Sequence, residues 1–177
     1  MAVKETGVSY YGISYPEHAR RDFQEMIDHN CNAVILALTE FDIDFWFPNI
    51  IEITKVAKEM GLKVYLDTWG IGKWFGGEPT SLFLTNNPGN RQVSALTGEA
   101  LPNACFNTPA FRDYFYRICE KLAEEVPADG FFWTSLIMLF RKVLLQLQVA
   151  WLMTGHAVVL YVRRNSSSSM AIRCQDF

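Results

Sequence analysis

Two carboxylates and three large aromatic side chains lie close together between Asp67 and Glu78, with Trp69, Trp74 and Phe75 between the two acids. Glycoside hydrolysis needs such a pair of acids, because one carboxyl group protonates the leaving oxygen while the other attacks the sugar or activates water. Aromatic rings offer broad flat apolar surfaces that can stack on sugar rings. These five residues are therefore the first candidates for a catalytic and sugar-binding site.

Further candidates follow the other predicted strands. Glu40 is a third candidate acid, and Trp46 could extend the aromatic surface. The remaining candidate substrate-binding residues are Tyr10, Tyr11, Asn107 and Trp133. A structural interpretation stands beside this one: a strand-end aspartate often hydrogen-bonds loop amides, an exposed glutamate is usually only solvated, and large aromatic side chains are common in cores.

The positions of apolar residues predict the elements that must hold these side chains. Short apolar or β-prone runs predict strands over 7–11, 33–38, 62–66 and 129–133. Helices are predicted from Pro16, Pro48 and Pro109, because proline is tolerated in the first helical turn. The expected core faces of the three helices are Ala19, Phe23, Met26 and Ile27; Ile50, Ile53, Ala57 and Met60; and Phe111, Phe115, Ile118, Cys119 and Leu122. Residues 69–107 are predicted to form a long loop.

This alternation of strands and helices predicts a parallel sheet in an α/β fold. Two architectures fit: half of a (β/α)8 barrel, or a small doubly wound sheet. The polar and aromatic residues gather just after the strands, where a barrel builds its site. A doubly wound sheet follows a similar rule but usually has a glycine-rich turn after its first strand, and Gly12-Ile-Ser-Tyr-Pro16 is not such a turn. The barrel is therefore favoured.

Residues 67–78, 104–109 and 128–133 resemble segments of bacterial glycoside-hydrolase-like (β/α)8 proteins. In that family the third βα loop carries a Trp-Gly…Phe-Gly-Gly-Glu run, an Asn-x-Pro turn starts the third helix, and the fourth strand ends in Trp-Asp-Glu-Pro or similar. The resemblance covers residues 7–133. It implies a partial TIM-type barrel of about four βα units, and a carbohydrate or glycoside as substrate.

The sequence departs from this pattern after Trp133, where Thr134-Ser-Leu136 replaces the expected acidic residues. The charge changes at the same place: residues 1–133 hold 11 basic and 18 acidic residues, whereas residues 134–177 hold 5 basic residues and 1 acidic residue. We therefore expect two parts, a half-barrel over 1–133 and an apolar, basic, non-homologous tail over 134–177.

Three interpretations of the tail compete. A membrane span is disfavoured because charged and polar residues interrupt every 18-residue apolar window, and a partner-binding amphipathic helix over 136–153 is an alternative. The sequence favours a truncated or frameshifted gene product, since a shifted frame explains the lost acids and the lost motif together. Reading the other frames of the coding DNA after codon 133 tests this hypothesis, and finding no Asp-Glu-Pro continuation would contradict it.

Composition argues against other classes of function. The net charge of −3 and scattered basic residues do not suggest nucleic acid as a partner. No cofactor is expected, because Gly70-Ile-Gly-Lys73 belongs to no GxxxxGK[ST] motif and GxGxxG would need glycine at Phe75. No metal site is expected either. Without a visible signal peptide or paired cysteines, the protein is expected in the cytoplasm with reduced thiols.

The sequence thus predicts a truncated glycoside-hydrolase-like protein whose own activity is weak or lost. Enzymatic activity is left open. A carbohydrate-binding or structural fragment is the alternative, and a small nucleotide-binding α/β domain is less favoured. Because the first and fourth strands would lack their usual barrel neighbours, we expect self-association through exposed strand edges.

Overall fold

The computed structural model describes residues 5–73, 81–94, 97–132 and 159–160. Four parallel strands lie side by side in chain order: β1 (Gly7–Tyr10), β2 (Ala33–Thr39), β3 (Lys63–Gly70) and β6 (Gly130–Phe132). β7 (Val159–Leu160) pairs antiparallel with β6 at one edge of the sheet. The four strands predicted from apolar runs are therefore confirmed, but β3 continues to Gly70, four residues past its predicted end and into the segment predicted as a loop.

Three long helices connect these strands: α1 (Pro16–Asp28), α3 (Phe47–Glu59) and α5 (Pro109–Glu125). Each carries a proline in its first turn, as predicted. The segment predicted as one long loop instead contains α4 (Leu82–Asn86), a single 3-10 turn (Pro88–Asn90) and a hairpin of β4 (Arg91–Val93) and β5 (Ala100–Ala104). A short helix, α2 (Glu40–Phe45), also follows β2.

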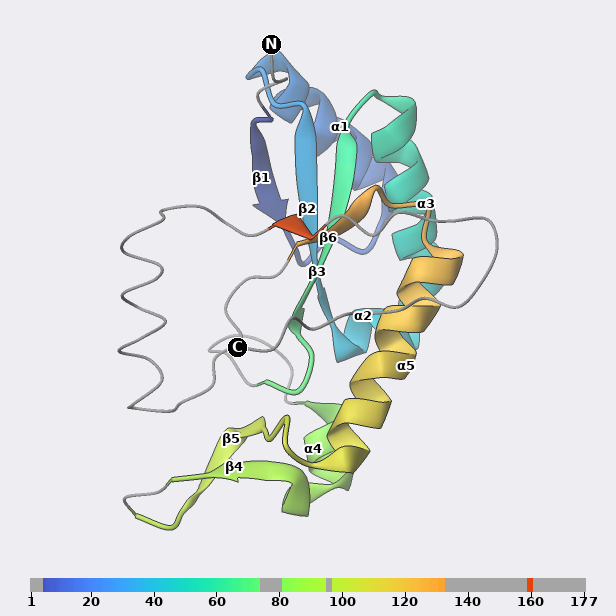
Figure 1. Cartoon of the computed structure of the whole chain (residues 1–177). Helices are drawn as coiled ribbons and strands as arrows, with labels where there is room; N and C mark the ends of the chain where they lie inside the picture. The colour runs from blue at the N-terminus through green and yellow to red at the C-terminus, as the bar shows by residue number, and fades with distance from the viewer. Residues whose placement is uncertain (1–4, 74–80, 95–96, 133–158, 161–177) are drawn as a thin grey trace.

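The three long helices pack on one face of the sheet (Figure 1). Most of their buried side chains form one core with alternate strand residues, namely Val34, Leu36 and Leu38 of β2, Val64 and Leu66 of β3, and Phe131 of β6. A doubly wound sheet would reverse its strand order and place helices on both faces. The described strands do neither, so the doubly wound alternative is wrong for this part of the chain.

The other face of the sheet carries the remaining strand residues, because successive side chains point to opposite faces. Ile35 and Tyr65 are register partners there, and so are Ala37 and Asp67. The Asp67 side chain therefore lies on the face away from the helices, near the carboxyl end of β3. This is the end at which α2 and α4 also lie (Figure 1).

The two edges of the sheet differ. Phe131 and Phe132 of β6 pair with Leu160 and Val159 of β7, so the expectation that the fourth strand has a free edge is wrong. β1 pairs with β2, and within the described ranges no other strand pairs with β1. No helix in the described part of the chain combines the length and apolar character needed to cross a membrane.

Candidate functional site

Asp67 is 3% exposed at the carboxyl end of β3. Just beyond it the pairing with β2 is irregular: Ala37 pairs with Asp67, but Thr39 pairs with Gly70, so β3 contains one extra residue. Such bulges bend a strand and redirect its side chains. Sequence and fold therefore place the Asp67 carboxyl group beside an irregularity at the strand end, where parallel α/β proteins bind ligands.

Trp69 lies in this irregular stretch and contacts Tyr11, which follows β1. Their ring centroids are 5.9 Å apart with the planes inclined by 60°. Tyr11 is 65% exposed and Trp69 is half-buried, so the pair presents aromatic surface to solvent. Two predicted sugar-binding residues, 58 positions apart in the chain, are thereby brought together at the end of the sheet that holds Asp67.

Trp46 forms a second aromatic pair, with Tyr15 in the loop after β1. The rings are 5.6 Å apart in an edge-on arrangement. The Asn49 side-chain amide donates to the Ser14 carbonyl at 2.6 Å and ties this loop to α3. Tyr15 was not among the predicted site residues. Its position next to Pro16, at the start of a helix that follows a strand, was the available signal.

Tyr10 has a different environment from Tyr11. Its hydroxyl donates to an Asp22 carboxylate oxygen at 2.5 Å, and its ring lies 5.2 Å from Phe23. Burial, and then the hydrogen bond to Asp22, raises the pKa of Tyr10 above its usual range. These contacts tie β1 to α1 and place the predicted binding residue Tyr10 against the helix layer.

Glu40 is placed by a local signal at the start of α2. The Thr39 hydroxyl accepts from the Asp42 amide, and the Asp42 carboxylate accepts from the Thr39 amide, which forms a capping box. Glu40 is then the first helical residue and is 3% exposed. The structure thus buries a residue that the sequence offered as a candidate acid.

Both carboxylate oxygens of Glu40 accept hydrogen bonds from the chain. Oε1 accepts from the Gly72 amide and the Ser81 hydroxyl, each at 2.7 Å, and Oε2 accepts from the Phe83 amide at 2.8 Å. Burial first, then the charges of Glu40 and Asp44 and a hydrogen bond to Glu40, raise the pKa of Tyr114. The loop after β3, the first turn of α4 and helix α5 therefore converge on one carboxylate.

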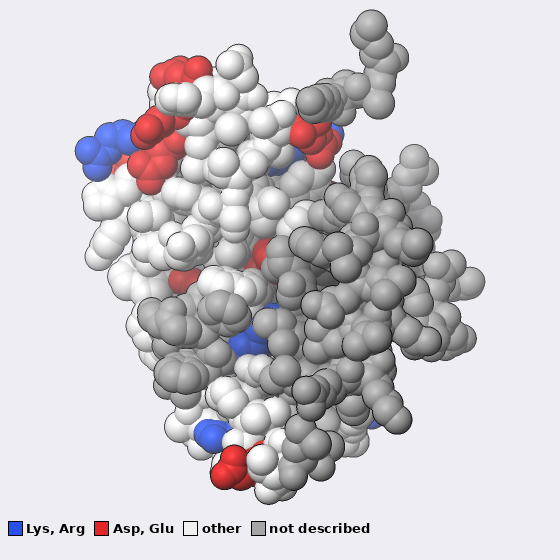
Figure 2. Space-filling model, turned by 90° about the vertical axis from the view of Figure 1, so that its left-hand side faces the viewer, with Lys and Arg blue, Asp and Glu red and all other residues white. Residues whose placement is uncertain are grey.

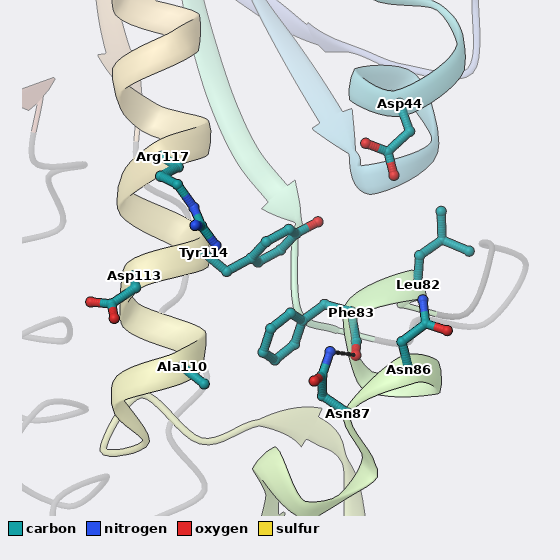
Figure 3. A pocket seen from close by; sticks show the side chains of 9 residues that line it. All are labelled: Asp44, Leu82, Phe83, Asn86, Asn87, Ala110, Asp113, Tyr114 and Arg117. Carbon is teal, nitrogen blue, oxygen red and sulfur yellow. Dashed lines mark hydrogen bonds between the residues drawn. The ribbon is translucent and has the colours of Figure 1, made fainter.

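A hollow of about 440 Å³ lies between α2, α4 and α5 (Figure 3). The rings of Phe83 and Tyr114 stack at 4.7 Å inside it, with Asp44 and Arg117 on its walls. None of these residues was predicted to form a site. No sequence motif marks them, since they come from three separate elements.

The other predicted residues have varied positions. Asn107 is exposed in the turn before α5. Trp74, Phe75, Glu78 and Trp133 lie outside the described residues, so their roles remain sequence predictions.

On the face shown in Figure 2 the described acidic side chains gather mainly at the upper end, while the visible basic ones are scattered. That face of the described residues shows no broad basic surface of the kind that binds nucleic acid.

No protein-family model matches the sequence, and no curated protein matches it. Among solved structures the chain is similar to an alpha-amylase from Lactobacillus plantarum, with a TM-score of 0.51 and 14% identity over 82% of this chain. A maltogenic alpha-amylase, AmyB from Thermotoga neapolitana, gives a TM-score of 0.48 and 13% identity over 82% of this chain. The chain spans 41% and 42% of their lengths. At such identity the first likeness concerns the fold alone.

Proposed function

We propose that this chain is part of a glycoside-hydrolase-like protein and binds a carbohydrate at the carboxyl ends of its parallel strands. The observation that carries the proposal is the placement of Asp67 at the end of β3 that also holds the Tyr11–Trp69 pair. A carboxylate can accept hydrogen bonds from sugar hydroxyls, and the exposed aromatic pair offers apolar surface for a sugar ring. The order of the strands and the one-sided helices support a segment of a (β/α)8 barrel.

In this proposal Asp67 is the candidate catalytic acid of the described residues, and Glu78 is its candidate partner from the sequence. Trp69, Tyr11 and Trp46 form the sugar-binding surface. Trp74, Phe75 and Trp133 extend it if the sequence prediction holds. The proposal includes a cytoplasmic location, expected from the sequence, and weak or lost hydrolysis by this chain.

The test begins with binding, because binding does not require a complete catalytic pair. A panel of soluble oligosaccharides is titrated into the whole chain by calorimetry, and Trp69→Ala is compared with Tyr116→Ala. Tyr116 is 47% exposed on α5 and serves as the matched aromatic control. We expect Trp69→Ala to weaken binding by about tenfold, or about 1.4 kcal/mol, because the variant loses the apolar ring surface offered to the sugar, and Tyr116→Ala to leave it unchanged. Absence of binding across the panel would contradict the proposal.

Hydrolysis distinguishes an enzyme from a binding fragment. In an enzyme, Asp67→Asn removes a proton-transferring or nucleophilic group, and general acid–base catalysis alone contributes about 10²–10⁴-fold. In a binding fragment the same change leaves the affinity for sugar nearly intact, and neither the unmodified chain nor Asp67→Asn releases sugar from the substrate. The sequence after Trp133, which lacks the expected acids, favours the binding fragment.

A further inference from the structure

The hollow between α2, α4 and α5 is a second concave surface of the described structure. Its volume of about 440 Å³ falls in the range of about 300–1,000 Å³ that is usual for small-ligand sites. The described residues proposed to bind a carbohydrate, Asp67, Tyr11, Trp69 and Trp46, do not line it. A ligand in this hollow would therefore be independent of the proposed carbohydrate site.

One wall of the hollow is a face of α5. Ala110, Tyr114 and Arg117 lie at i, i+4 and i+7, so they are neighbours along the surface of this helix. The Tyr114 ring stacks on Phe83 of α4, with ring centroids 4.7 Å apart and planes inclined by 23°. Two rings from different elements thus form an apolar surface inside the hollow (Figure 3).

Asp44 and Arg117 bring opposite charges to two different walls. Asp44 comes from α2, and the Tyr114 side chain extends from α5 toward it (Figure 3). After burial and the charge of Glu40, the charge of Asp44 is a further cause of the raised pKa of Tyr114, so Asp44 lies near the Tyr114 hydroxyl. Within the described ranges neither Asp44 nor Arg117 forms an ion pair, and Arg117 does not pair even with Asp113, one turn before it.

This combination of groups suits a ligand that carries both an ammonium and a carboxylate group. A guanidinium binds a carboxylate through two parallel hydrogen bonds, and an ammonium offers three donors to a carboxylate of the protein. A purely anionic ligand would be repelled by Asp44, and a purely cationic one by Arg117. The stacked rings offer apolar surface for the carbon chain between the two charged groups.

We propose that the hollow between α2, α4 and α5 binds a small zwitterion, with Arg117 on its carboxylate, Asp44 on its ammonium and the Phe83–Tyr114 pair against its carbon chain. Asp44 and Arg117 are exposed, so water competes with the ligand for both charges. Exposed ion pairs contribute little free energy, so the expected dissociation constant is on the order of 1 mM.

The experiment titrates the whole chain with unbranched amino acids, from glycine to 6-aminohexanoate, and follows its amide signals by NMR. The series varies the distance between the ammonium and the carboxylate. We expect at least one member to shift the amides of Phe83 and Tyr114. The alkanoate and the alkylamine of the same chain length are the matched probes, because each lacks one charged group, and each should bind about fivefold more weakly.

Variants of the two charged residues test their assignment. Arg117→Gln and Asp44→Asn should each weaken binding of the best amino acid about fivefold, since each removes one ion pair with the ligand. Arg112→Gln on α5 and Asp28→Asn on α1 are the matched controls, because both residues are exposed and neither lines the hollow. Trp69→Ala, the variant of the carbohydrate proposal, should also leave this affinity unchanged.

Three results would overturn the proposal. Absence of binding by every member of the series removes the site. A single-charge probe that binds as tightly as the amino acid contradicts the ligand class, and so does neutral maltotriose if it shifts the same amides at lower concentration. Unchanged affinity in both Arg117→Gln and Asp44→Asn places the amino acid elsewhere on the protein. Failure of the carbohydrate proposal changes none of these outcomes.

Discussion

Gly70 shows how closely the backbones pack beside the candidate site. A Cβ atom placed on Gly70 would lie 2.6 Å from the Thr39 Cγ2 and 2.9 Å from the Thr39 Cα. Real Cβ atoms do not approach a backbone atom so closely, so a side chain here must move β2 and β3 apart. The site therefore depends on glycine at the point where β3 regains its pairing with β2.

We expect Gly70→Ala to lower the free energy of unfolding by about 1–3 kcal/mol, the usual cost of overpacking. Gly89→Ala is the control, because no atom lies within 4 Å of its added Cβ and its φ angle is negative. Urea unfolding of the two variants measures the difference. Equal stability of both would show that β2 and β3 separate without cost.

For single residues, the sequence could identify candidates for the site but could not distinguish their roles. Asp67 and Glu40 both follow apolar strands, and both were candidate acids. The partners of Glu40 lie 32, 41 and 43 positions away along the chain. Such contacts depend on how distant loops pack, and no local pattern encodes them. By contrast, the capping box at Thr39 and Asp42 is local, and its spacing was readable.

At the scale of elements, Asp129 connects the start of β6 to helix α3 and strand β3. Its carboxylate accepts from Lys58 Nζ of α3 at 2.6 Å and from the Val64 amide of β3 at 2.8 Å. Burial alone would raise the pKa of Asp129, but the bonds from Lys58 and Val64 bring it below its usual range. The carboxylate is therefore more stable in the folded protein than in the unfolded chain.

We expect Asp129→Asn to cost about 1 kcal/mol at pH 7, a discounted value for a charged hydrogen bond that is partly exposed to solvent. Because the folded pKa is depressed, this contribution is present above the ordinary aspartate value of about 4 and is lost as pH falls through the lower folded value. Thermal unfolding between pH 7 and pH 3 tests it. The difference between the two proteins should shrink toward pH 3, and a constant difference would contradict the assignment.

The long elements were predictable because their signals are local and repeated. The helices from Pro16 and Pro109 begin where proline and apolar periodicity agree, and the helix predicted from Pro48 begins one residue earlier, at Phe47. The elements missed are short: α2 has 6 residues, α4 has 5 and β4 has 3. Elements of this length owe their stability to packing rather than to propensity. Leu84 and Phe111, for instance, meet in a small second core.

At the scale of the whole molecule, the described strands form a parallel sheet of an α/β structure whose strand order does not reverse. The order β1-β2-β3-β6 adds each parallel strand on the same side, as the proposed barrel segment requires. The absence of a glycine-rich turn after β1 had favoured the barrel over a doubly wound sheet in the sequence. The antiparallel β7 could not be foreseen, because residues 134–177 show no strand–helix alternation.

We expect the chain to associate through the exposed edge of β1, as unpaired strand edges do. Val8 is 39% exposed on β1, and Val8→Lys places a charge on that edge. Light scattering over a range of concentrations should show a dimer for the unmodified chain and a monomer for this variant. Val93→Lys, on the hairpin strand β4 and 63% exposed, is the matched control and should still form the dimer. A monomer at every concentration would contradict the prediction.

β7 also determines what kind of assembly such pairing could make. At the other end of the described sheet β7 is the outermost strand, and it runs against the direction of the other strands. Two copies that meet through β1 about a twofold axis use up the β1 edge on both, so the contact is closed. Open-ended growth into a fibre would need a second adhesive edge on each copy. The described sheet ends there in β7, a strand of two residues, and so short an edge strand offers little backbone for another chain to pair with.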